Sequence, residues 1–142
     1  MRQGHTLLEL SAALFLASLA ASATFRGAAQ MRDALAVTGA REAVAGLVAE
    51  ARRAAVASGG ARVRVEAFPA RAWIEVGDSL HRALGLEAEW GVSVVLARGR
   101  TGTTLRYDAL GLGQVASETL RLRRGGAERA LVISGYGRVR RP

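Results

Sequence analysis

A long run of apolar and small residues near the amino terminus limits what this chain of 142 residues can fold into. Between His5 and Phe25 the single charged side chain is Glu9. As a helix, about twenty such residues are roughly 30 Å long, just enough to cross the hydrocarbon core of a bilayer. No proline interrupts the chain from Phe25 to Ser58. The sequence therefore predicts one long helix whose first half, residues 5–25, spans a membrane.

The second half of this helix, residues 26–58, carries an apolar stripe with the three- and four-residue spacing of a helix. Its members are Val37, Ala40, Val44, Leu47, Val48, Ala51, Ala54 and Ala55. Most charged residues of the segment fall outside the stripe, which predicts an amphipathic helix with one buried face. Ser58, Gly59 and Gly60 end the pattern, because glycine suits the backbone conformation that closes a helix.

From residue 61 onward the apolar residues alternate with polar ones, which is typical of strands with one buried face. We expect about seven short antiparallel strands within 62–68, 72–76, 92–97, 103–107, 119–123, 129–133 and 136–140. Residues 79–85 are predicted to form a helical turn, and Gly125-Gly126 a tight hairpin turn. The predicted fold class is α+β, with the long helix packed on a sheet in a β-rich globular domain, residues 61–142.

Composition excludes several kinds of active site. The chain has no cysteine, and all twenty basic residues are arginine, so thiol chemistry, disulfides, P-loop nucleotide binding and lysine Schiff bases are ruled out. Two histidines are too few for a histidine-rich metal site. We expect no metal, no cofactor, no small-molecule substrate and no enzymatic activity. For His81, which lies near Asp78 and Ser79, we predict local capping contacts and not catalysis.

The net charge of +8 is concentrated in the last third of the chain, since residues 98–142 hold ten arginines and three acidic residues. Such asymmetry favours an acidic partner, either a nucleic acid or an anionic surface.

Two ordinary readings compete for the amino-terminal segment. One is a secretory signal peptide cleaved after Ala21-Ser22-Ala23, and the other is a plain single-pass anchor. Neither gives a reason for Glu9, because a carboxylate inside hydrocarbon costs about 2.5–3.5 kcal/mol at mid-helix and usually marks a function.

The segment Gly4-His5-Thr6-Leu7-Leu8-Glu9-Leu10 resembles the amino terminus of type IV pilins and type II secretion pseudopilins. The resemblance implies that residues 1–4 form a leader, that a prepilin peptidase cuts between Gly4 and His5, and that His5 is then N-methylated. It also implies that Glu9 neutralises the amino terminus of a neighbouring subunit during assembly. The family usually has phenylalanine where this chain has His5. The implied location is the inner membrane, crossed once with the globular domain in the periplasm, and afterwards a pilus or pseudopilus.

The carboxy-terminal half resembles the GspH/FimT branch of the same family. The resemblance rests on the turn at Tyr107–Gly111, the Gly125-Gly126 hairpin and the final Gly137-Arg138-Val139-Arg140. FimT-type minor pilins include members that bind DNA during uptake through a carboxy-terminal Gly-Arg-x-Arg motif, which this chain matches. GspH-type members are minor tip components of the type II secretion pseudopilus. A DNA-uptake subunit for natural transformation and a subunit for pseudopilus assembly and protein export are therefore both implied.

The arginines of the motif have the spacing of a phosphate-binding surface. In an extended segment Arg138 and Arg140 project from one side, about 6.6 Å apart, while Val139 faces the other. Guanidinium groups pair well with phosphate oxygens, and such contacts read the backbone and not the base sequence. Because Tyr136 is the one aromatic residue next to the motif, base stacking has little support, and double-stranded DNA is the predicted target. Further candidates for this surface are Arg141 and, from the preceding hairpin, Arg121, Arg123, Arg124 and Arg129. The ordinary alternative is that these arginines are simply solvated.

Overall fold

The computed structural model describes residues 6–114 and 117–142. This part of the chain divides between Arg32 and Asp33 into two compact units, which we describe separately. Helix α1 comprises Leu7–Ser58 and so contributes to both. Gly4 and His5, the predicted cleavage site, lie outside the described residues.

The first unit is the amino-terminal part of α1. Thr6 precedes the helix, and its Oγ1 accepts a hydrogen bond of 3.3 Å from the Glu9 backbone N–H, which caps the first turn. The described side chains between Leu7 and Arg32 are all exposed, including large apolar ones such as Leu8 and Phe15. The helix contains an 18-residue window with a mean hydropathy of 1.7, so by length and composition it can cross a membrane. Exposed apolar surface of this extent marks a segment that another phase or partner covers.

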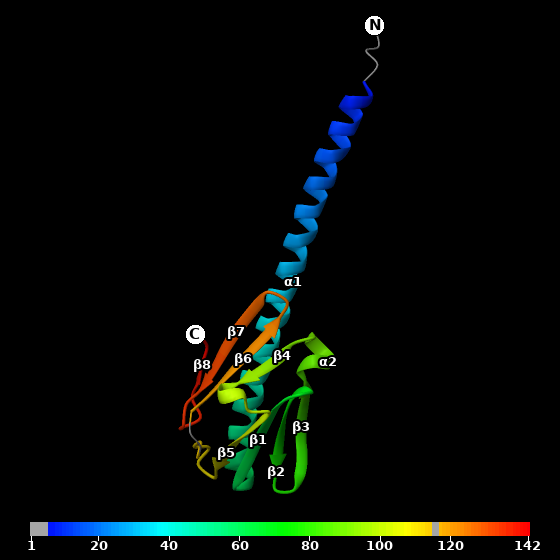
Figure 1. Ribbon diagram of the computed structural model, residues 1–142. Helices are drawn as coiled ribbons and strands as arrows, with labels where there is room; N and C mark the ends of the chain where they lie inside the picture. The colour runs from blue at the N-terminus through cyan, green and yellow to red at the C-terminus, as the bar shows by residue number, and fades with distance from the viewer. Residues whose placement is uncertain (1–5, 115–116) are drawn as a thin grey trace. The chain divides into compact units, whose positions relative to one another are not determined.

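The second unit contains the carboxy-terminal part of α1 and eight strands in the described chain (Figure 1). The elements after α1 are β1 (Gly60–Ala67), β2 (Ala70–Val76), β3 (Ser79–Gly85), α2 (Leu86–Trp90), β4 (Ser93–Leu96), a 3₁₀ turn (Ala97–Gly99), β5 (Gly102–Asp108), β6 (Glu118–Arg124), β7 (Ala127–Ile133) and β8 (Val139–Arg140). They form two antiparallel sheets, ordered β3-β2-β1-β5 and β4-β6-β7-β8. The predicted class, a long helix packed on antiparallel strands, is confirmed.

The core lies between α1 and the two sheets. From the helix, the predicted stripe supplies Val37, Ala40, Val44, Leu47, Val48, Ala51 and Ala55 as buried residues, with Ala54 partly buried. The sheets supply alternate residues of their strands, for example Val63 and Val65 from β1 and Leu120 and Leu122 from β6. The helix ends where predicted, because Gly59 adopts a φ of +83° directly after Ser58.

Two expectations about the strands were wrong. Residues 79–85 form strand β3, not a helical turn, and the strands form two sheets, not one. The segment Leu80-His81-Arg82-Ala83-Leu84 has no strong intrinsic preference for a strand, but pairing with β2 decides its conformation. Because β3 is an edge strand with Leu84 as its one buried residue, it lacks the alternation that revealed the other strands.

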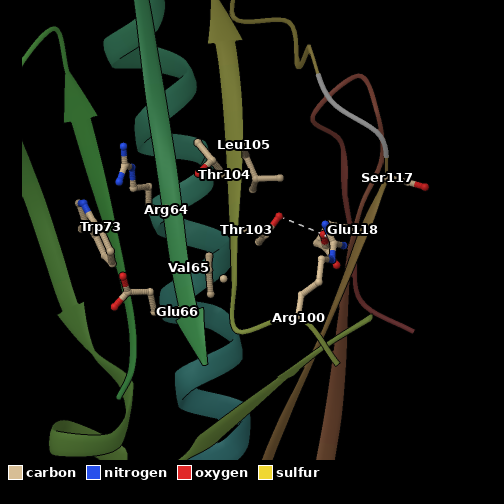
Figure 2. Close-up of a pocket in the computed structure, with 11 residues that line it drawn as sticks. Arg64, Val65, Glu66, Trp73, Arg100, Thr103, Thr104, Leu105, Ser117 and Glu118 are labelled. Carbon is tan, nitrogen blue, oxygen red and sulfur yellow. Dashed lines mark hydrogen bonds and ion pairs between the residues drawn. The ribbon is translucent and has the colours of Figure 1, made fainter. Parts of the chain in front are cut away.

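A buried carboxylate links the two sheets. Glu118, at the start of β6, is 3% exposed, and its Oε2 accepts hydrogen bonds from Arg100 and, at 3.0 Å, from Thr103 Oγ1 on β5 (Figure 2). Its Oε1 has no hydrogen-bond partner among the described residues. A hollow of about 440 Å³ lies beside this cluster. A buried carboxylate is costly unless a cation compensates it, so Arg100 stabilises the junction between β5 and β6.

We expect Arg100→Ala to destabilise the protein by about 3 kcal/mol, because it leaves the charge of Glu118 buried without a cation. The measurement is urea unfolding of the full chain in a nonionic detergent, followed by tryptophan fluorescence. Arg106→Ala is the matched control, since Arg106 is exposed on β5 and makes no ion pair within the described chain. Its expected effect is within about 0.5 kcal/mol. Equal effects of the two variants would contradict the role assigned to Arg100.

Candidate nucleic-acid interface

Strand β6 presents two arginines on its outward side. Leu120 and Leu122 point into the core. The alternate residues Arg121 and Arg123 therefore point outward, and both are exposed. The neighbouring strand β7 supplies Glu128, which pairs with both: its Oε1 lies 3.7 Å from Arg121 Nη1, and its Oε2 accepts a hydrogen bond from Arg123 Nε. One carboxylate shared by two guanidinium groups leaves a net positive charge on this side of the sheet.

Strands β7 and β8 are joined by a three-residue hairpin loop, Gly135-Tyr136-Gly137. Gly137 N–H donates to the Ser134 carbonyl at 2.8 Å, and Ser134 N–H donates to the Arg138 carbonyl at 2.8 Å. Gly137 has a φ of +78°, the left-handed conformation that follows the turn in common three-residue hairpins. This loop sets the register in which Ile133 faces Val139 and Val132 faces Arg140.

That register places the motif arginines as their spacing predicts. Ile133 is buried, so its partner Val139 faces the core and is partly buried. Arg138 and Arg140 lie on the outward side and are exposed. Neither guanidinium makes an ion pair with any of the residues described. They are therefore available to an external anion.

The alternation of β6 and the β7–β8 register bring four arginines to one side of one sheet. We name this set, Arg121, Arg123, Arg138 and Arg140, the arginine face. In an ideal sheet the Cα atoms of Arg138 and Arg140 are about 6.6 Å apart, and those of Arg121 and Arg140, two strands apart, are about 12 Å apart. These spans suit successive contacts along an extended polyanion better than the capture of one small anion.

The remaining arginines predicted for this surface are not on the arginine face. Arg124 pairs with Asp33 of α1, with 3.0 Å between Nε and Oδ1, and donates to the Trp90 carbonyl. Arg141 Nε lies 3.0 Å from Glu42 Oε2, also on α1. Arg129 is exposed, but its register partner is Leu122, so it projects from the other side of the sheet than the arginine face. Its Nη1 donates to the Glu128 carbonyl at 2.9 Å. Sequence spacing alone did not separate these three from the others.

The glycine of Gly-Arg-x-Arg has a structural role that the sequence did not reveal. A Cβ on Gly137 would lie 2.6 Å from Tyr107 Cε1, so the loop packs directly on this ring. Tyr107 is buried, its hydroxyl has no hydrogen-bond partner among the described residues, and burial raises its pKa to about 12, against a smaller lowering by Arg52. The phenol thus stays neutral below about pH 12 and supports the loop that carries Arg138 and Arg140.

Glu9, the predicted assembly residue, lies in the first turn of α1. Its backbone N–H donates to the Thr6 carbonyl at 3.0 Å as well as to the hydroxyl. The role of its carboxylate in assembly stays a prediction.

Histidine 81 lies on β3 beside the helix. Its Nε2 is 3.4 Å from Glu50 Oε1, and Glu50 Oε2 also accepts from Arg82 Nη1 at 2.5 Å. The partner of His81 is therefore Glu50 and not the neighbouring Asp78 or Ser79. Across residues 6–114 and 117–142, no group of three or more histidine or acidic side chains is arranged to hold a metal ion.

Comparison with solved structures identifies the architecture. Two crystal structures of the type IV minor pilin FimU from Pseudomonas aeruginosa have the same arrangement of helix and sheets. The first matches with a TM-score of 0.59 and 15% sequence identity, over 75% of this chain and 87% of FimU. The second matches with a TM-score of 0.57 and 16% identity, over 74% and 91%. This is the fold of a type IV minor pilin.

The likeness to FimU is one of fold, at a sequence identity too low to carry function. No protein-family model and no curated protein matches the sequence. The predicted GspH/FimT branch and the DNA-binding role of its motif therefore stay predictions.

We expect Gly137→Ala to destabilise the protein by about 2–4 kcal/mol, because it adds the cost of a left-handed alanine to a collision with the Tyr107 ring. Urea unfolding of the full chain in nonionic detergent measures this. Gly126→Ala is the matched control, since no atom lies within 4 Å of the added Cβ and its φ is not positive. The control should leave stability unchanged or slightly higher. A Gly137→Ala variant as stable as the control would show that the loop does not depend on this contact.

Proposed function

We propose that the chain is a minor type IV pilin that assembles into a pilus and binds the phosphate backbone of duplex DNA for uptake. The observation that carries the proposal is the arginine face, which holds four exposed guanidinium groups and one nearby carboxylate, Glu128. It is combined with the fold of a type IV minor pilin and with an apolar helix long enough to cross a membrane.

The assembly part of the proposal is supported by the first unit. Its exposed apolar helix suits the inner membrane before assembly and the interior of a helical bundle afterwards. The proposed sequence is cleavage between Gly4 and His5 by a prepilin peptidase, methylation of His5 and entry into a filament of other pilin subunits. Glu9 would then pair with the amino terminus of a neighbour, because opposite charges that are each costly in a low dielectric compensate when they meet. The globular unit would face the periplasm.

The DNA part is supported by the chemistry of the arginine face. Guanidinium groups make bidentate contacts with phosphate oxygens and carry their charge at any physiological pH. About four phosphate contacts would give a logarithmic salt slope near −3.6, which corresponds to weak binding at physiological salt. Contacts with phosphates are independent of base sequence, as uptake of arbitrary DNA requires.

A GspH-type subunit of a type II secretion pseudopilus is the second candidate. A hollow of about 560 Å³ favours it, because a partly apolar surface can accept another protein. The lining residues are Ala49, Arg52, Arg53, Val56, Leu110 and Gly111. Leu110 is 77% exposed and Val56 is 59% exposed. Such a subunit requires no affinity for DNA.

Binding to a short fluorescent duplex, followed by anisotropy between about 50 and 200 mM salt, tests the DNA part. We expect Arg138→Gln/Arg140→Gln to weaken binding at low salt by about tenfold or more and to lower the salt slope by about 1.8. The control is Arg53→Gln/Arg106→Gln, which removes two exposed arginines outside the arginine face. Absence of binding by the wild-type chain at the lower salt would favour the secretion subunit.

Recovery of the chain in sheared filaments from cells that carry its assembly machinery tests the assembly part. We expect Glu9→Gln to lower incorporation by about tenfold or more while membrane levels stay the same, because the amide cannot neutralise a partner's amino terminus. Asp78→Asn is the control, since Asp78 is fully exposed in the globular unit. Wild-type incorporation of Glu9→Gln would rule out charge pairing as the assembly device.

A further inference from the structure

A tight turn after β4 holds an arginine in an uncommon backbone conformation. Arg98 has φ 60° and ψ 25°, and it is the one non-glycine residue with positive φ in the described chain. Gly99 follows with φ 66°, and Arg100 N–H faces the Ala97 carbonyl at 3.5 Å. Two successive left-handed residues make a type I′ turn, in which glycine, asparagine or aspartate normally takes the place of Arg98. Arg98 therefore occupies a position whose backbone conformation disfavours a long side chain. Residues in such strained conformations are often found at functional sites.

Arg98 lines a hollow on the outward side of the second sheet. The hollow has a volume of about 380 Å³, and Arg98, Arg121, Arg123 and Thr119 line it together with Val95 and the backbone turn. Because β4 pairs with β6 in this sheet, the hollow lies next to the β6 part of the arginine face. It can hold a phosphate group together with several water molecules, since one water occupies about 30 Å³.

The charges around the hollow are incompletely compensated. Glu128 is the carboxylate that pairs with Arg121 and Arg123. Arg98 has no hydrogen-bond or ion-pair partner for its guanidinium anywhere in residues 6–114 and 117–142. The three arginines and one carboxylate therefore leave a charge of +2 beside a concave surface. An anion is the ligand that this combination favours.

We propose that this hollow binds a phosphodiester group of duplex DNA and that Arg98 is its principal contact. The inference rests on the proposed function and extends it by a residue that lies outside the Gly-Arg-x-Arg motif. Thr119 lines the same hollow and supplies a hydroxyl donor, and Arg121 supplies a second guanidinium.

The register of the sheet places the hollow and the motif within reach of one duplex. Thr119 pairs with Val132, which pairs with Arg140, so all three lie in one row across the strands. Two strand spacings separate the Cα atoms of Thr119 and Arg140 by about 10 Å, a span between the widths of the minor and major grooves, about 6 and 12 Å. Because arginine side chains extend well beyond their Cα atoms, phosphates on either side of a groove can contact the hollow and Arg140 at the same time.

The test uses the full chain in nonionic detergent and a short fluorescent duplex, with anisotropy measured between about 50 and 200 mM salt. Arg98→Gly is the informative variant, because glycine suits the positive φ and the turn should remain folded. We expect a loss of affinity of about three- to tenfold and a salt slope lower by about 0.9. The urea midpoint of this variant should equal or exceed that of the wild type, which separates lost contact from lost fold. Arg106→Gln is the matched control for net charge, and we expect it to change affinity less than about twofold.

The outcomes separate this inference from the function on which it rests. If Arg98→Gly binds like Arg106→Gln while Arg138→Gln/Arg140→Gln loses affinity, the hollow is not a phosphate site but the proposed function stands. If the wild-type chain fails to bind the duplex even at the lower salt, the DNA part of the proposed function is wrong, and this inference falls with it. If phosphatidylglycerol added to the detergent micelles is bound through Arg98 and the duplex is not, the ligand is a lipid headgroup and the inference is overturned.

Discussion

The close packing of small side chains between α1 and two sheets is the constraint on which the globular unit depends. The buried stripe of the helix is largely alanine and valine, so both sheets can approach the helix closely. The short helix α2 also packs closely on α1, because a Cβ added at Gly39 would lie 3.3 Å from the indole nitrogen of Trp90 at the end of α2. Each strand packs one set of alternate side chains against the apolar stripe of α1, so the other set faces outward. The arginine face is a direct result of this choice.

Much of the fold could be predicted from the sequence because its strongest signals are local. An uninterrupted helical pattern, its glycine stop and the alternation in β1, β6 and β7 each report on a few consecutive residues. Strand β3 was missed because its conformation comes from pairing with β2, and an edge strand need not alternate. The division into two sheets depends on which strands pair, as with β4 and β6, and such pairing joins residues far apart in sequence.

The candidate site was predictable to a similar degree. The spacing of Arg138 and Arg140 correctly indicated that they share a side, since this depends on the local period of two. Whether an arginine is free or already paired depends on distant partners, such as Asp33 for Arg124 and Glu42 for Arg141. No sequence motif pointed to Arg98. It stands out only through its positive φ and through the arginines of the neighbouring strand β6.

In the second sheet, alternation also separates the residues on the outer surface of the domain from the residues that form its core. Arg121 and Arg123 touch solvent while Leu120 and Leu122 next to them make the core, so substitutions at exposed positions of this kind usually change stability by less than about 0.5 kcal/mol. The outward side can therefore acquire or lose charge at little thermodynamic risk to the scaffold. During evolution, single surface residues can therefore change independently of the core. One pilin architecture can in this way acquire unrelated ligands without a new core.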